Sequence, residues 1–205
     1  TIMRQKLLFM QAPTGVGKTI STIFPAVKAV GEELADRIFY LTAKTITATV
    51  AKETFALLEK NGYRAKTIQI TAKEKLCPCD EMECNPVTCP YAKGHFDRVN
   101  DAVFDLLHRC EMIERDDILS QADRYTVCPF ELCLDTASWC DNIICDYNYV
   151  FDPNVYLKRF FQEGIKGDYI FLIDEAHNMV ERSRQMYSAQ IYNCLLYTSP
   201  SPRDA

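Results

Sequence analysis

This sequence lacks any stretch of about 18 consecutive apolar residues, so no membrane-spanning helix is expected. It also lacks a basic-then-apolar leader at its start, so we expect no secretory signal and predict a cytoplasmic protein. The tight C-x2-C pairs that are typical of zinc ribbons are missing. A positive net charge is missing as well, and the formal charge of −5 argues mildly against nucleic-acid binding.

What is present is the composition of an ordinary globular protein. The 205 residues are 48% hydrophobic and 25% charged, enough for one full core and a small second unit. The charges are unevenly distributed: residues 37–75 carry eight basic and three acidic side chains, whereas residues 76–135 carry five basic and thirteen acidic ones. A basic face can bind a phosphate backbone inside an acidic protein, but on charge alone a solvated helix surface explains the pattern equally well.

The rest of the chain is organised around residues 6–19, KLLFMQAPTGVGKT. The apolar run Leu7–Met10 predicts a buried strand, and the apolar period after the loop predicts a helix. Strand, glycine-containing loop and helix in this order predict a phosphate-binding loop, because the loop N–H groups and the helix N-terminus both attract an anion. The alternative is an ordinary glycine-rich turn before a helix. The residues expected to bind ATP are Thr14, Gly15, Val16, Gly17, Lys18 and Thr19.

Within this loop, Lys18 is expected to reach the β- and γ-phosphates and to act in catalysis, while the Thr19 hydroxyl is expected to hold Mg²⁺. The loop departs from the usual pattern at its first position, where Ala12 replaces glycine.

Further along, buried strands are predicted at residues 37–41, 66–71 and 169–173, and residues 142–150 are predicted to be a buried strand that runs into a loop, with helices between the strands. The apolar character of residues 169–173 predicts a central strand. This alternation predicts the α/β class, with a parallel sheet and right-handed crossovers. The last strand runs into D-E-A-H, where Asp174 is expected to hold the same Mg²⁺ as Thr19 and Glu175 to activate the attacking water as a general base.

Residues 76–135 interrupt this pattern with a stretch rich in Cys, Pro and acidic residues, followed by a helical pattern at 96–112. The stretch cannot bury a core of its own, so bound metal is the expected source of order. Six residues separate Cys77 from Cys84, four separate Cys84 from Cys89, and thirty-eight separate Cys89 from Cys128. Four thiolates suit zinc or an iron–sulfur cluster, and the spacing does not distinguish the two metals or Cys77 from Cys79. The cysteines that fall in apolar patterns, and are expected to pack, are Cys110, Cys133, Cys140 and Cys145.

Taken together, these motifs resemble those of the XPD/DinG-like iron–sulfur DNA helicases of superfamily 2, especially the bacterial branch, from residue 6 to about residue 192. The resemblance rests on five motifs: APTGVGKT at 12–19, TAKT at 42–45, CPYA at 89–92, CPF at 128–130 and DEAH at 174–177. In that family, alanine at the position of Ala12 is normal. The resemblance implies a RecA-like P-loop sheet with helices on both faces, interrupted by a Cys-rich, mostly helical iron–sulfur insertion.

The resemblance also implies function: ATP-driven 5′→3′ translocation on single-stranded DNA and unwinding of duplex junctions, in DNA repair or replication. The implied cofactors are ATP, Mg²⁺ and a [4Fe-4S] cluster, and a monomer without membrane contact is expected. By position, the cluster ligands are Cys77, Cys84, Cys89 and Cys128, and TAKT matches the motif that grips the single strand.

Under this interpretation residues 1–75 and 136–192 are the two halves of the first motor domain, and residues 76–135 are the cluster insertion. The chain begins almost on its first predicted strand, and no second motor domain is recognised, so a fragment that does not unwind DNA alone is expected. Residues 194–204, CLLYTSPSPRD, resemble a translated sequencing adapter, which makes 193–205 a predicted non-native tail; the alternative is a Ser/Pro linker.

Two other functions fit the same residues. One is a zinc-bearing P-loop ATPase that acts on nucleic acid without separating strands, and the other is a nucleotide-dependent binding module that never hydrolyses ATP. The identity of the metal distinguishes the first from a helicase, and ATP hydrolysis with and without single-stranded DNA distinguishes the second.

Overall fold

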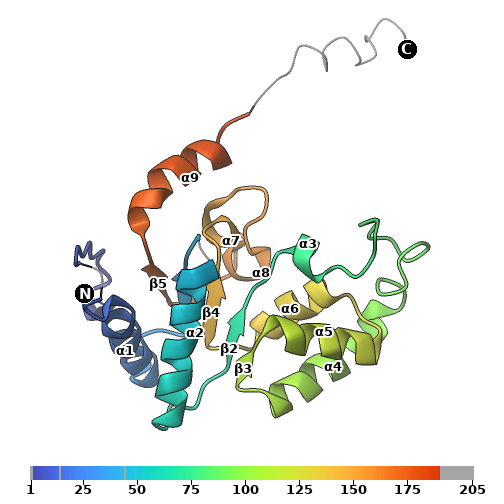
Figure 1. Cartoon of the computed structure of the whole chain (residues 1–205), viewed down its shortest axis with the longest axis horizontal. Helices are drawn as coiled ribbons and strands as arrows, with labels where there is room; N and C mark the ends of the chain where they lie inside the picture. Colours follow the sequence, from blue (N-terminus) through green and yellow to red (C-terminus); the bar gives the residue numbers. More distant parts are fainter. Residues whose placement is uncertain (1, 14, 44, 190–205) are drawn as a thin grey trace, which may run out of the picture.

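In the part of the chain that the structure describes, five parallel strands form a single sheet in the order β3-β2-β4-β1-β5 (Figure 1). The structure is a computed structural model that describes residues 2–13, 15–43 and 45–189. The strands are β1 (Arg37–Leu41), β2 (Thr67–Gln69), β3 (Met112–Ile113), β4 (Asn142–Cys145) and β5 (Tyr169–Ile173). The helices are α1 (Lys18–Gly31), α2 (Thr45–Lys60), α3 (Lys73–Leu76), α4 (His95–Arg109), α5 (Arg115–Tyr125), α6 (Pro129–Ala137), α7 (Asn148–Phe151), α8 (Lys158–Phe161) and α9 (Met179–Met186), with short 3-10 turns at Ile2–Arg4 and Ala176–Asn178. None of the helices in these described ranges is long and apolar enough to cross a membrane.

Strand β1 shows why both faces of the sheet are covered. Its residues alternate between the two faces, because successive side chains of a strand point in opposite directions. Ile38 and Tyr40 pack with α1 and α2 in one core, whereas Phe39 and Leu41 pack in a second core with α4, α5, α6 and α8. The parallel α/β sheet with helices on both faces is therefore confirmed.

The segment 76–135 does not stand apart from the sheet. Its two-residue strand β3 pairs in parallel with β2, so that Thr67 lies opposite Met112. Ile113, Leu106 and Leu132 of this segment are fully buried and share one core with the sheet. The polar stretch 115–125, which has a weak apolar pattern, forms helix α5 because a capping box at Glu114 satisfies its first N–H groups.

Two expectations about the edge of the sheet are wrong. Leu7–Met10 is not a buried strand: Leu7 is 89% exposed and Phe9 is 88% exposed, and this segment has no regular structure. Strand β5 is not central either, because within the described part of the chain it pairs only with β1. An apolar run indicates a tendency to be buried, but burial also requires a partner surface, and a run does not identify that partner.

We expect Phe39→Ala to lower the free energy of unfolding by about 3–5 kcal/mol, because it leaves a cavity in the core. The Phe39 ring is fully buried and contacts four aromatic rings at centroid distances of 5.1 to 5.5 Å: Phe160, Phe161, Tyr169 and Phe171. Urea denaturation followed by circular dichroism measures the change. Phe96→Ala, at a ring that is 86% exposed, is the matched control, and an equal loss in both variants would contradict this assignment of the core.

Candidate functional site

The backbone of the predicted phosphate-binding loop turns at its two glycines. Gly15 and Gly17 have φ angles of 82° and 78°, in the left-handed region that favours glycine. Gly17 directly precedes α1, and its carbonyl accepts the N–H of Ser21 at 3.0 Å. Lys18 and Thr19 therefore form the first turn of a long helix, where unpaired N–H groups favour an anion. Thr14 lies outside the described residues.

The DEAH segment begins where β5 ends. The N–H of Asp174 donates to the carbonyl of Leu41 at 3.0 Å, which continues the pairing of β5 with β1. Glu175 has a φ of 50°, a left-handed conformation that costs a non-glycine residue about 1–3 kcal/mol and persists only where the surroundings enforce it. Its N–H donates to the Asp174 carboxylate at 3.0 Å, and its own carboxylate lies 3.4 Å from Nδ1 of His177. The two acidic side chains are half-buried at the carboxyl end of the strand.

Tyr40 of β1 connects the phosphate-binding loop with the DEAH segment. Its side chain lies close enough to both Thr19 and Asp174, the two residues expected to hold Mg²⁺, for each of them to shift the pKa of its phenol. Burial raises the pKa of Tyr40 above its usual range, and the negative charge of Asp174 raises it further. The phenol therefore stays protonated beside the Asp174 carboxylate. Two expected site residues from opposite ends of the sequence thus lie at one place.

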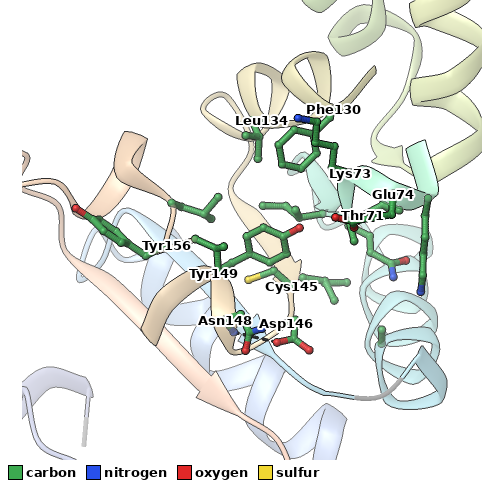
Figure 2. Close-up of a pocket in the computed structure, with 18 of the residues that line it drawn as sticks. Thr71, Lys73, Glu74, Phe130, Leu134, Cys145, Asp146, Asn148, Tyr149 and Tyr156 are labelled. Atoms are coloured by element: carbon green, nitrogen blue, oxygen red, sulfur yellow. Dashed lines mark hydrogen bonds between the residues drawn. The ribbon is translucent and has the colours of Figure 1, made fainter. Parts of the chain in front are cut away.

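A second feature is a cavity of about 950 Å³ at the carboxyl ends of β1, β2 and β4 (Figure 2). In open α/β sheets this edge is where ligands bind. Thr42 and Ala43, from the TAKT segment that follows β1, line the cavity; Lys44 of that segment lies outside the described residues. Tyr149 lies near its centre, and Phe130 and Tyr156 border it on different sides.

The cavity lining is positively charged on balance. It contains five basic side chains and three acidic ones. Among the described residues, neither Lys75 nor Lys158 forms an ion pair, whereas Arg159 pairs with Glu131 at 2.8 Å. Aromatic faces beside unpaired lysines suit a ligand that has both flat rings and negative charges. The basic residues are Lys73, Lys75, Arg115, Lys158 and Arg159, and the acidic ones are Glu74, Glu131 and Asp146.

The predicted cluster cysteines lie near this cavity, in the loop after α3 and at the start of α6. Cys128 directly precedes α6, and burial raises the pKa of its thiol, while hydrogen bonds from the N–H groups of Phe130 and Glu131 lower it. Its own N–H donates to Nδ1 of the buried His95 at 3.2 Å. A thiolate at this position would therefore have backbone donors already directed at it.

Lys73 links these cysteines to one another. A hydrogen bond with Cys84 is the main reason that the pKa of Lys73 is raised, and Cys128 and Cys77 add to it. Partial burial, followed by hydrogen bonding with Cys89 and the proximity of Cys77, raises the pKa of Cys79 to about 11. The four predicted ligands and Cys79 therefore share one neighbourhood. Cys133, Cys140 and Cys145 are instead buried packing residues, as predicted.

This donor set is chemically suited to an iron–sulfur cluster or zinc, since thiolates are ligands for both. Within residues 2–13, 15–43 and 45–189, however, no three His, Cys, Asp or Glu side chains converge closely enough to hold a metal ion. The cluster and its ligands therefore remain predictions.

Comparison with known proteins identifies the family of this chain. The sequence profile of the family DEAD_2 matches residues 47–196, more than half of the chain. The chain belongs to the DEAD_2 family. The XPD-like resemblance of the sequence is thereby confirmed.

Two curated proteins are similar to this DEAD_2 chain. The General transcription and DNA repair factor IIH helicase subunit XPD/RAD3 of Saccharomyces cerevisiae is 24% identical over 204 residues, covering 83% of this chain and 26% of the yeast protein. The Fanconi anemia group J protein homolog of Gallus gallus is 28% identical over 76 residues, covering 37% of this chain and 6% of the chicken protein. The chain thus spans about a quarter or less of these relatives.

Two solved structures have the same fold. The structure titled XPD_Helicase superimposes with a TM-score of 0.59 at 18% identity, covering 88% of this chain and 31% of that one. The structure titled Truncated XPD has a TM-score of 0.51 at 18% identity, covering 82% of this chain and 47% of that one.

Sequence analysis missed two residues of the site. Tyr40 was expected only as a buried strand residue, and nothing in the apolar run 37–41 distinguishes its hydroxyl from the neighbouring methyl groups. Arg182 lies in α9, and its side chain reaches Asp146 at the end of β4. Its position one helical turn beyond the DEAH box is the only sequence signal that could have identified it.

Proposed function

We propose that this chain carries the nucleotide-binding part of an ATP-dependent DNA helicase motor. The observation that most supports this function is that Thr19 and Asp174, from opposite ends of the sequence, both lie beside the hydroxyl of Tyr40. A P-loop ATPase needs these two groups together, because both would hold the Mg²⁺ that accompanies the nucleotide. When bound, Mg²⁺ would neutralise the charge that develops on the phosphates.

In this proposal the protein residues have separate tasks. Lys18 and the loop N–H groups bind the phosphates, with Gly15, Val16 and Gly17 supplying the curved backbone. Glu175, held beside the end of β5, orients and deprotonates the attacking water. His177 lies 3.4 Å from the Glu175 carboxylate and is well exposed, which suits a contact to neighbouring groups better than a chemical step.

The cavity at the carboxyl ends of β1, β2 and β4 is proposed as part of the path of single-stranded DNA. Aromatic side chains provide surfaces on which bases stack, and lysines neutralise phosphates. Tyr149, Phe130 and Tyr156 would serve the first purpose, and Lys75 and Lys158 the second. The 5′→3′ direction and the [4Fe-4S] cluster held by Cys77, Cys84, Cys89 and Cys128 belong to the same proposal.

The experiment that tests this function uses a full-length protein that carries these residues. ATP hydrolysis is measured with and without oligothymidylate, and strand separation is measured on duplexes with a single 5′ or a single 3′ tail. DNA-stimulated hydrolysis with unwinding only of the 5′-tailed duplex is expected. Stimulated hydrolysis without unwinding favours the ATPase that does not separate strands, and DNA binding without hydrolysis favours the binding module.

Replacing both lysines of the cavity, Lys75→Glu with Lys158→Glu, should weaken binding of oligothymidylate and make it less dependent on salt. Each lost phosphate contact reduces the slope of log affinity against log salt by about 0.7 for single strands, so a reduction of about 1.4 is expected. Fluorescence anisotropy across a salt series measures this slope. Lys28→Glu, at an exposed residue of α1 outside the cavity, is the control. An unchanged slope in the double variant would remove the cavity from the DNA path.

A further inference from the structure

Two consecutive residues after β4 both bind the segment that contains and follows the DEAH box. The first is Asp146, whose two carboxylate oxygens each accept a hydrogen bond from Nη2 of Arg182 at 2.8 Å. The same carboxylate accepts the backbone N–H of Asn148 at 2.9 Å, at the start of α7. Both partners of the ion pair are about one-third exposed, so the pair fixes an orientation more than it adds stability.

The second residue, Tyr147, is fully buried, and its hydroxyl reaches the backbone of the DEAH box. It donates a short hydrogen bond to the carbonyl of Asp174 and lies 3.4 Å from the carbonyl of Glu175. These carbonyls belong to the two peptide groups on either side of the left-handed Glu175 Cα. The Tyr147 hydroxyl therefore helps to hold the strained backbone that sets the direction of the Glu175 side chain.

The turn after β4, which carries Asp146 and Tyr147, borders the cavity on its opposite side. Asp146, Asn148 and Tyr149 all line it, and Figure 2 shows them beneath and beside its centre. Tyr187, just beyond α9, adds a third link by donating to the carbonyl of Phe151 at 3.3 Å. Residues 146–151 thus lie between the cavity and the DEAH segment, with hydrogen bonds to the DEAH side and contacts to the cavity.

We propose that Asp146, Tyr147 and Arg182 form a coupling clamp, through which nucleic acid in the cavity controls the position of Glu175. The inference rests on the proposed function and describes how the activity of that site is regulated. Coupling requires an element with two arrangements. In this proposal that element is the backbone of Glu175, because a left-handed non-glycine residue relaxes once its restraints are lost. All three clamp residues act as positioning residues.

The test compares Tyr147→Phe and Arg182→Gln in a full-length protein that carries these residues. Tyr147→Phe removes only a hydroxyl and keeps the buried ring, so folding is preserved. The ratio of ATPase rates with and without oligothymidylate should fall about tenfold, within the usual range of coupling between two sites. The dissociation constant for oligothymidylate should remain within about twofold of the parent value, because neither variant removes a proposed DNA-binding group.

Two matched variants separate coupling from general destabilisation. Tyr63→Phe removes a half-buried hydroxyl that donates to Asn142 at 3.1 Å, away from the DEAH box. Arg184→Gln removes an exposed arginine from α9, where it lies 3.8 Å from Glu181. Both controls should keep the parent stimulation ratio. Arg182→Lys, which keeps the charge, should recover part of the ratio that Arg182→Gln loses.

The outcomes are distinguishable. Loss of stimulation in Tyr147→Phe and Arg182→Gln, with retained DNA affinity and controls like the parent, supports the clamp. A parent-like ratio in both variants overturns the clamp and leaves the proposed function intact. A fall in DNA affinity that matches the fall in the stimulation ratio also overturns the clamp, because the clamp residues would then act only by shaping the cavity. A parent protein whose ATPase does not respond to oligothymidylate overturns the proposed function, and the clamp with it.

Discussion

Replacing Lys18 with alanine lowers ATP hydrolysis by a full-length protein carrying this chain about a hundredfold to a thousandfold, and ATP-driven unwinding is lost with it. This is the usual effect of removing one preorganised donor from a developing negative charge. Lys18 is the first residue of α1, directly after the left-handed Gly17, so its side chain starts beside the N–H groups that would bind the phosphates. No neighbouring cation in the first turn can replace it, because the next basic residue of the described helix is Lys28.

The measurement is the steady-state ATPase rate at saturating oligothymidylate, together with strand separation on a 5′-tailed duplex. Lys28→Ala is the matched control, because Lys28 lies in the same helix with an exposed side chain 3.7 Å from Glu32. The control should retain the parent rate. Persistent unwinding by Lys18→Ala would show that residues 12–19 are an ordinary turn before a helix and not a phosphate-binding loop.

The meeting of the phosphate loop with the DEAH box was predictable from sequence. Thr19 follows a glycine loop that opens a helix, and Asp174 follows a strand, and in a parallel sheet such positions meet at one edge. The sequence pattern does not reveal Tyr40, the residue that lies between Thr19 and Asp174. Tyr40 lies in an apolar run whose burial was predicted, but which neighbour a buried hydroxyl finds depends on the strand order, and the order β4-β1-β5 is not encoded locally.

Other features depend on contacts between distant parts of the chain. Arg182 and Asp146 are polar residues in different elements, and no spacing rule relates a helix after one strand to the turn after another. Leu7–Met10 shows the converse: its apolar run predicts burial, yet the segment is exposed and unpaired within the described residues. Local pattern predicts which elements form, whereas their partners depend on packing across the whole sheet.

The second large effect concerns the cysteines near the cavity. Residues 77–94 form only turns and irregular backbone, so the hydrogen bonds within this loop are local and none of them belongs to a helix or strand. Cys128 is different from the three other predicted ligands, because it precedes α6 in the packed part of the molecule. A metal centre held by all four thiolates would therefore tie the loop to the core.

Cys128→Ser should therefore remove the metal and loosen the loop, while sparing part of the ATPase. Purified without oxygen, the parent protein should contain about four iron and four sulfide per chain, and the variant should contain little of either. Limited proteolysis should then cut the variant faster within residues 78–93, a readout independent of activity.

The control is Cys110→Ser, at a half-buried cysteine just after α4 that should keep the iron. Unchanged iron in Cys128→Ser would remove this residue from the site, and stoichiometric zinc in the parent would favour the zinc-bearing ATPase. A parent protein that folds without metal would contradict the idea that a metal orders the loop, because the contacts seen here between Lys73 and the cysteines would then suffice to hold it.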